Sequence, residues 1–240
     1  MGRNPFRLAT AVVEVALMDF IIENFFNLDI MRQAFPMLLR GFWMTLLLMA
    51  IVIPLGCLGG LAVAVIGTSR RWWVRWLIIG YVDFFRAFPP LVLLIFVYAG
   101  LPFAGLDLSP LASVALAFLL NTSAYYGEVF RAGIESIGRG QVEAARSTGL
   151  SSLQTMGYVV LPQAVRNVLP DVVSNTLEVA KLTSLASVVA LPELLYSADM
   201  ARSVTFNATP IVMAAGFYLV LLWPLVRLAS RLEHRAMARS

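Results

Sequence analysis

Three polar residues interrupt an apolar stretch around residue 180, and their types and spacing are those of a binding stripe. Asn175, Glu178 and Lys181 recur at every third position, so in a helix they lie on one face. Ionisable side chains within long apolar segments usually face a protein interior or a water-filled path. The stripe therefore indicates either a ligand site with both charge signs or a mutual Glu178–Lys181 ion pair, and the sequence supports the two equally.

A second polar group lies near the end of another apolar segment. Asn121 and Glu128 are candidates for the same polar path, but Arg131 follows Glu128 by three positions. This spacing favours a Glu128–Arg131 ion pair that braces the helix end over a ligand contact. Asp83 and Arg86 have the same spacing, and a local structural pair is a sufficient account of them.

The composition excludes several kinds of chemistry. Of the 240 residues, 60% are hydrophobic and 13% are charged, with a mean hydropathy of +0.81. One compact core cannot bury so much apolar side chain, so we expect a polytopic membrane protein. The net charge of +4 comes from arginines scattered between apolar runs, which disfavours nucleic-acid binding. A single cysteine, Cys57, and a single histidine, His234, disfavour disulfide, zinc and other metal chemistry.

Five apolar segments are candidate transmembrane helices and must position the polar groups. The predicted spans are residues 41–66, 88–101, 111–130, 168–190 and 211–226. Residues 72–87 are expected to form a membrane-surface helix that turns into the second span at Pro89-Pro90. The arginine-bearing loops and the C-terminal tail fall on one side, which the positive-inside rule makes cytoplasmic. We therefore expect turns at 102–110 and 191–209 outside, an outside N-terminus and a cytoplasmic C-terminus.

These spans predict three parts of the chain. Residues 1–36 form an extracytoplasmic or interfacial segment, residues 37–230 the transmembrane domain with a cytoplasmic loop at 131–166, and residues 231–240 a cytoplasmic tail. Acidic residues at 14, 19 and 23 argue against a signal peptide. They suggest an amphipathic interfacial helix, or a non-native extension if translation begins at Met18.

The longest stretch without a span, residues 131–162, carries its own helix signals. A helix-forming run at 141–146 is followed by Gly149, which can end that helix in the left-handed conformation. Ser151 and Gln154 have the spacing of a capping box for a second short helix. We therefore predict two small helices that protrude from the membrane domain.

This loop resembles the EAA loop of ABC importer permeases. The resemblance rests on Glu143-Ala144-Ala145, Gly149 and Leu161-Pro162, and it extends to DFFRAFPPLVLL at 83–94 and KLTSL at 181–185. The same stretches are similar to the branch that takes up polar amino acids (His/Glu/Gln/Arg/opine). The resemblance implies an all-α, type I ABC importer permease fold in a bacterial inner membrane.

The resemblance also implies that the first short helix docks on an ATP-binding subunit. The residues that would couple to that subunit are Gln141, Glu143, Ala144, Ala145, Gly149 and Leu150. Small alanines would let the helix enter a cleft, and Glu143 would accept charged hydrogen bonds at its rim. The alternatives for Glu143 are a pair with Arg146 or a solvated face. The chain has no GxxxxGK[ST] loop, so we expect no cofactor and no catalytic residue here, with ATP and magnesium used by the partner subunit.

The implied assembly contains two ATP-binding cassette subunits, a second identical or related permease chain and an extracytoplasmic solute-binding protein. An amino acid substrate would place its ammonium against Glu178 and its carboxylate against Lys181, with Asn175, Asn121 and Glu128 as further candidates. An ion-coupled carrier or a channel is the alternative, but the sequence lacks inverted repeats and a charge relay. A membrane-embedded enzyme would need a cluster of catalytic groups, which the sequence also lacks.

Overall fold

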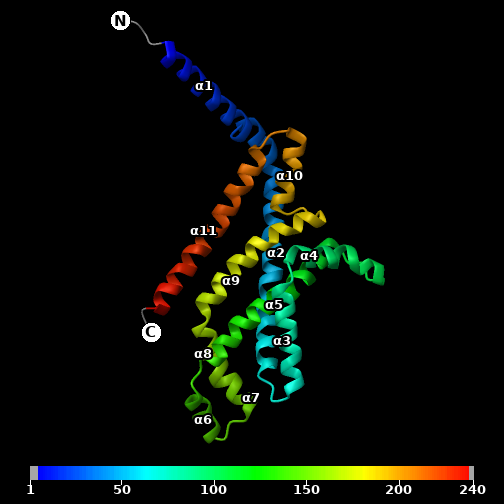
Figure 1. The fold of residues 1–240 in the computed structure, drawn as a ribbon, viewed down its shortest axis with the longest axis vertical. Coiled ribbons are helices and arrows are strands. Elements are labelled where there is room, and N and C mark those ends of the chain that lie inside the picture. Colours follow the sequence, from blue (N-terminus) through cyan, green and yellow to red (C-terminus); the bar gives the residue numbers. More distant parts are fainter. Residues whose placement is uncertain (1–4, 238–240) are drawn as a thin grey trace. The chain divides into compact units, whose positions relative to one another are not determined.

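The computed structural model describes residues 5–237, which form helices and contain no strand (Figure 1). The α-helices are α1 (Pro5–Phe25), α2 (Leu28–Gly67), α3 (Trp72–Ala87), α4 (Pro90–Ile95), α5 (Pro110–Glu135), α6 (Arg139–Ser147), α7 (Ser152–Thr155), α8 (Leu161–Asn167), α9 (Leu169–Leu182), α10 (Leu194–Thr205) and α11 (Thr209–Met237). Shorter π or 3-10 turns are η1 (Phe96–Gly100), η2 (Leu101–Ala104), η3 (Met156–Val160) and η4 (Thr183–Val189). The predicted all-α fold is confirmed.

The chain divides into two compact units. The first unit joins the chain up to Thr45 with Pro192–Val220, and the second joins Leu46–Leu191 with the chain from Leu221 onward. Both α2 and α11 contribute residues to each unit. The predicted site residues, from Asn121 to Lys181, all belong to the second unit.

The first unit has a small apolar core between the beginning of α2, α10 and the beginning of α11. Its buried members are Ala34, Leu38, Leu194, Ala198, Ala201 and Ala214. The turn expected at 191–209 is wrong, because residues 194–205 form α10 and bury its small side chains in this core. The loop after α10 is hydrogen-bonded to the α1–α2 junction, where the Ala208 amide donates to the Asn24 carbonyl at 3.0 Å.

Helix α2 is longer than the predicted span. Helix α2 has 40 residues, begins before the predicted span 41–66 and passes without a break through the predicted domain boundary at residue 36. Residues 5–25 form the helix α1, and its expected interfacial position stays a prediction. The predicted tail at 231–240 lies partly outside the described residues.

Several helical stretches are long and apolar enough to cross a membrane. Two of them, Ala16–Gly67 and Thr209–Leu232, contain 18-residue windows with mean hydropathies of 2.5 and 2.0. Two bent helix pairs raise the number of candidate spans within residues 5–237 to four. One pair bends by 101° between α3 and α4, and the other consists of Leu169–Val189 and α10. The remaining predicted span is α5, whose polar run at 121–126 lowers its hydropathy. The chain is a polytopic membrane protein, and a count of five spans depends on including α5.

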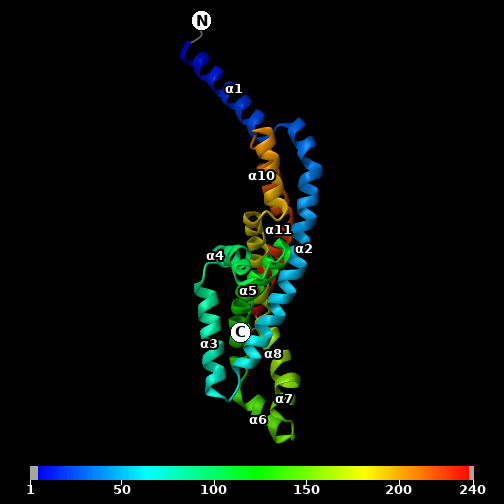
Figure 2. The same ribbon diagram turned by 90° about the vertical axis from the view of Figure 1, so that its right-hand side faces the viewer.

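Helix α5 is the centre of the second unit. It packs against α3, α4, α8 and α9, and it buries Phe118 and Tyr126 completely. Figure 2 shows α3 beside α5, and the Tyr81 hydroxyl on α3 donates to the Leu120 carbonyl on α5 at 3.1 Å. Residues 72–87 thus pack along α5, while their expected position at the membrane surface stays a prediction, and the break at Pro89-Pro90 is where the sequence predicts it.

The two predicted small helices are confirmed. Residues 139–160, here called the protruding segment, contain α6, a turn, α7 and η3 at one end of the second unit (Figures 1 and 2). Gly149 has φ = +89°, the left-handed conformation that ends α6. Ser151 and Gln154 form the predicted capping box at the start of α7. Local sequence signals therefore determine the shape of this segment.

Candidate functional site

Three of the five predicted pathway residues line one cavity. Asn121, Asn175 and Glu178 contribute to a cavity of about 300 Å³ between α5 and α9, here called the amide cavity. Its other lining residues are Pro90, Thr122, Tyr125, Val179 and Leu182. The helices hold these positions because Asn175 and Glu178 are one turn apart on α9, while Asn121 faces α9 from α5.

The amide cavity contains two buried polar atoms without a protein partner. Asn121 is 1% exposed, and its amide nitrogen donates to the Phe85 carbonyl at 2.9 Å while its Oδ1 atom accepts no hydrogen bond. The Nδ2 atom of Asn175 is also buried and donates to no acceptor. An unpaired buried polar atom costs roughly 1–3 kcal/mol, so a ligand that pairs with both atoms would recover that cost. Two residues that line the cavity therefore carry an unpaired acceptor and an unpaired donor.

Glu178 and Lys181 form the ion pair that the spacing allows. The Lys181 Nζ atom lies 2.6 Å from Glu178 Oε1, and more than half of each side chain is exposed. Lys181 does not line the amide cavity, whereas Glu178 does. Exposed ion pairs contribute only about 0–1 kcal/mol, so the pair leaves Glu178 available to a ligand at small cost.

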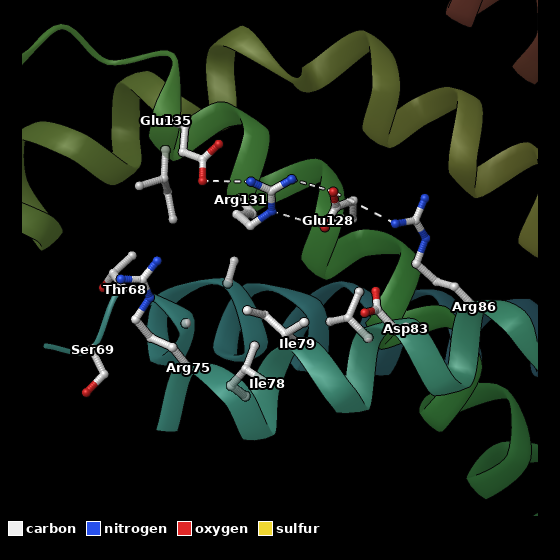
Figure 3. A pocket seen from close by; sticks show the side chains of 14 residues that line it. Thr68, Ser69, Arg75, Ile78, Ile79, Asp83, Arg86, Glu128, Arg131 and Glu135 are labelled. Atoms are coloured by element: carbon white, nitrogen blue, oxygen red, sulfur yellow. Dashed lines mark hydrogen bonds and ion pairs between the residues drawn. The ribbon is translucent and has the colours of Figure 1, made fainter. Parts of the chain in front are cut away.

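Glu128 forms an ion pair with Arg131 at the end of α5, as the three-residue spacing between them favours. Arg131 donates to both carboxylate oxygens of Glu128 and, at 2.7 Å, to Glu135 (Figure 3). These hydrogen bonds hold the Arg131 guanidinium between two carboxylates at the end of α5. Glu128 does not line the amide cavity. The role of Glu128 as a ligand-contacting residue therefore has no geometric support.

The expected Asp83–Arg86 pair does not form. Arg86 instead approaches Glu128 from α3, with 3.8 Å between Nη1 and Oε1, and its guanidinium lies 5.6 Å from the centre of the Tyr125 ring. Asp83 and Arg86 both line a second cavity of about 440 Å³ next to this ion-pair network (Figure 3). Arg86 reaches Glu128 because α3 packs along α5, a contact between distant parts of the sequence.

Glu143 is exposed on the protruding segment. Among the described residues it has neither a hydrogen bond nor an ion pair, and Arg146 donates to the Leu150 carbonyl at 2.8 Å instead. The alternative of a Glu143–Arg146 pair is therefore wrong, and the Glu143 carboxylate is free. Ala144 and Gln141 are also exposed, while Ala145 is 8% exposed and packs within the segment.

One buried acid was missed by the sequence reasoning. Glu193 is completely buried in the first unit, where it caps α10 by accepting hydrogen bonds from the Leu195 and Tyr196 amides. The Tyr218 hydroxyl donates to Glu193 Oε2 at 2.8 Å, and Thr45 lies at 3.5 Å. An acid that directly follows Leu191-Pro192 is an N-cap signal that could have predicted α10.

Known proteins of one family resemble this chain along most of its length. The model of the family described as "Binding-protein-dependent transport system inner membrane component" matches residues 56–237. The probable glutamine ABC transporter permease protein GlnM of Bacillus subtilis (strain 168) is 38% identical over 87% of this chain and 97% of its own length. The octopine transport system permease protein OccM of Rhizobium meliloti is 33% identical over 84% of this chain and 86% of its own length.

Solved structures show the same fold. A crystal structure titled as an amino acid ABC transporter with histidines matches with a TM-score of 0.77 at 32% identity, covering 85% of this chain and 96% of the matched chain. An inward-facing structure of the MetNI methionine ABC transporter matches with a TM-score of 0.70 at 17% identity, covering 83% of this chain and 96% of its own. The chain belongs to the family of binding-protein-dependent transport system inner membrane components, the membrane permeases of ABC transporters.

Proposed function

We propose that this permease imports polar amino acids and that the substrate passes through the amide cavity. The observation that carries the proposal is the meeting of an unpaired acceptor, an unpaired donor and a carboxylate in one cavity. The relatives GlnM and OccM, which are named as a glutamine and an octopine permease, support the same substrate class. The chain itself is a transport subunit and not an enzyme.

The chemistry of the amide cavity matches the two ends of an amino acid. The substrate ammonium would donate to Glu178 and to Asn121 Oδ1, and the substrate carboxylate would accept from Asn175 Nδ2. Asn175 therefore takes the role that the sequence interpretation gave to Lys181, which lies outside the cavity. A volume of about 300 Å³ is at the small end of ligand sites, which favours a single amino acid over a peptide.

The protruding segment is proposed to bind an ATP-binding subunit and to move with it when that subunit hydrolyses ATP. Its exposed surface includes Gln141, Glu143 and Ala144, and the free Glu143 carboxylate suits a charged donor on an ATP-binding subunit. Gly149 and Leu150 shape the turn behind α6. Movement of this segment would shift α5 and α8 between outward-open and inward-open states.

The proposed assembly follows from this division of roles. Two ATP-binding cassette subunits would bind ATP and magnesium, a second identical or related permease would complete the path, and an extracytoplasmic solute-binding protein would deliver the amino acid. In the proposed orientation the protruding segment and the C-terminus are cytoplasmic and the N-terminus is outside. The arginine-bearing turn after α2 and the protruding segment line the same cavity. This supports placing both on the same side of the membrane.

Uptake by the reconstituted complex tests the substrate site. Glu178→Gln is expected to lower uptake of labelled glutamine or arginine at subsaturating concentration by about tenfold or more, because it removes a charge-assisted contact. Lys181→Gln is the matched control, since it breaks the same ion pair without changing the lining of the amide cavity. Uptake and complex recovery should stay within about twofold of wild type in the control.

The two variants separate a ligand contact from an ion pair that merely stabilises the helix. A loss of assembly in Glu178→Gln and Lys181→Gln alike would show that the pair has a structural role. Equal uptake by wild type and Glu178→Gln would overturn the proposed substrate contact.

A further inference from the structure

A separate cavity of about 610 Å³ lies between the turn after α2 and the protruding segment, and here it is called the arginine cavity. Its polar lining consists of Arg70, Arg146 and the hydroxyl residues Thr68, Ser69, Ser152 and Thr155. No aspartate or glutamate lines it, although Asp83, Glu128 and Glu135 line the neighbouring cavity of about 440 Å³. The excess of positive charge makes the arginine cavity suitable for an anion.

The guanidinium groups of the arginine cavity are available to a ligand. Arg70 has no hydrogen bond or ion pair among the described residues. Arg146 uses only its Nη1 atom, which donates a hydrogen bond to the Leu150 carbonyl at 2.8 Å. Several donors therefore remain free, and guanidinium donors match the geometry of phosphate oxygens.

Thr155 provides an independent sign of a missing partner. It is 2% exposed, lines the arginine cavity, and has an Oγ1 atom without a hydrogen bond. A buried hydroxyl is normally paired with protein or with another polar group. A phosphate oxygen in the cavity would accept the hydrogen bond that Thr155 can donate.

The other residues around the arginine cavity suit a lipid better than a soluble ion. Apolar side chains complete the lining: Val65, Ile66, Val74, Ile134, Val142, Leu153, Met156 and Val160. The adjacent start of α3 exposes three tryptophans, Trp72, Trp73 and Trp76, and carries Arg71 and Arg75. Exposed tryptophans together with arginines are typical of a segment at the membrane interface. The apolar lining would contact the acyl chains of a lipid, and the arginines would contact its headgroup.

We propose that the arginine cavity binds the phosphate group of an anionic phospholipid. Arg70 contacts the phosphate from the turn after α2, while Arg146 and Thr155 contact it from the protruding segment. The bound headgroup therefore joins the membrane domain to the element that is proposed to receive the ATP-driven movement. This lipid site is distinct from the amide cavity, with which it shares no lining residue.

Native mass spectrometry of the full chain, purified with its copurifying subunits and titrated with phosphatidylglycerol, tests the proposal. Arg70→Gln is expected to weaken binding about fivefold or more, and Thr155→Val about two- to threefold. Arg70→Lys should retain most of the affinity because it keeps the charge. Arg71→Gln is the matched control, since it removes an adjacent arginine that does not line the cavity, and its affinity should stay within about twofold of wild type.

Three outcomes would overturn the lipid site. Equal losses in Arg70→Gln and Arg71→Gln would mean general attraction to a basic surface. Phosphatidylcholine that binds as tightly as phosphatidylglycerol would remove the role of net negative charge. Displacement of the lipid by an equal concentration of glycerol 1-phosphate would identify a site for soluble phosphate, whereas its failure to compete supports the lipid.

Discussion

Glycine has opposite roles in two regions of the second unit. One region is the contact between α2 and α5, and the other is the protruding segment. A Cβ atom added at Gly56 would lie 2.3 Å from Thr122 Oγ1, and one added at Gly60 would lie 2.4 Å from the Cβ atom of Tyr126. At Gly140 and Gly149 an added Cβ atom would meet nothing within 4 Å. Glycine brings two helix backbones together in the first region, whereas in the second it faces open space and Gly149 is needed for its left-handed conformation.

This difference separates a rigid contact from the proposed docking element. The α2–α5 contact has no room for an added Cβ atom at Gly60 of α2 or at Gly127 of α5. Tyr126 also shares a hydrogen bond of 2.8 Å with Thr176 on α9. The protruding segment keeps its shape through local features and presents an unpaired carboxylate at Glu143. A force applied at Glu143 would therefore reach helices that are packed too closely to slide independently.

The largest expected effect is the loss of the α2–α5 contact. Gly60→Leu places a branched side chain where Tyr126 and the Gly127 backbone already lie, so the helices must separate. We expect destabilisation of about 3 kcal/mol or more and little monodisperse protein in size-exclusion chromatography. Gly140→Ala is the control and should leave the yield unchanged, because nothing lies near its added Cβ atom. Wild-type yields of Gly60→Leu would show that the contact is not close.

A smaller effect is expected at the turn of the protruding segment. Gly149→Ala forces a Cβ atom into a left-handed residue with φ = +89°, which costs about 1–2 kcal/mol although the site has free space. We expect faster hydrogen exchange in α6 and α7 with unchanged exchange in α5. Unchanged exchange in α6 would mean that Gly149 does not determine the turn, and faster exchange in α5 would contradict the separation of the two regions.

The sequence predicted features that depend on neighbours within one or two helical turns. The Ser151–Gln154 capping box, the turn at Gly149 and the Glu128–Arg131 pair are all local, and all are confirmed. Such features were predictable because their partners are fixed by helix geometry alone.

Contacts between distant segments were not predictable from local spacing. Arg86 pairs with Glu128 instead of Asp83 because α3 packs on α5. Glu193 can be buried because Tyr218 and two backbone amides donate hydrogen bonds to its carboxylate. The unpaired Asn121 and Asn175 were each identified as candidates, but only the α5–α9 packing brings them to one cavity. Tertiary packing therefore decided which polar residues form a site and which form a brace.

Copurification of the ATP-binding subunit tests the central claim that Glu143 docks the partner. The tagged chain is purified from its native membrane in mild detergent, and the proteins that accompany it are identified and quantified. Glu143→Arg is expected to lower recovery of an ATP-binding subunit by about 30-fold or more and to abolish uptake, with membrane insertion intact. Asp171→Arg, a charge reversal at another exposed acid, should retain both. Full recovery and normal uptake in Glu143→Arg, or ATP-independent transport by the chain alone in liposomes, would contradict the account.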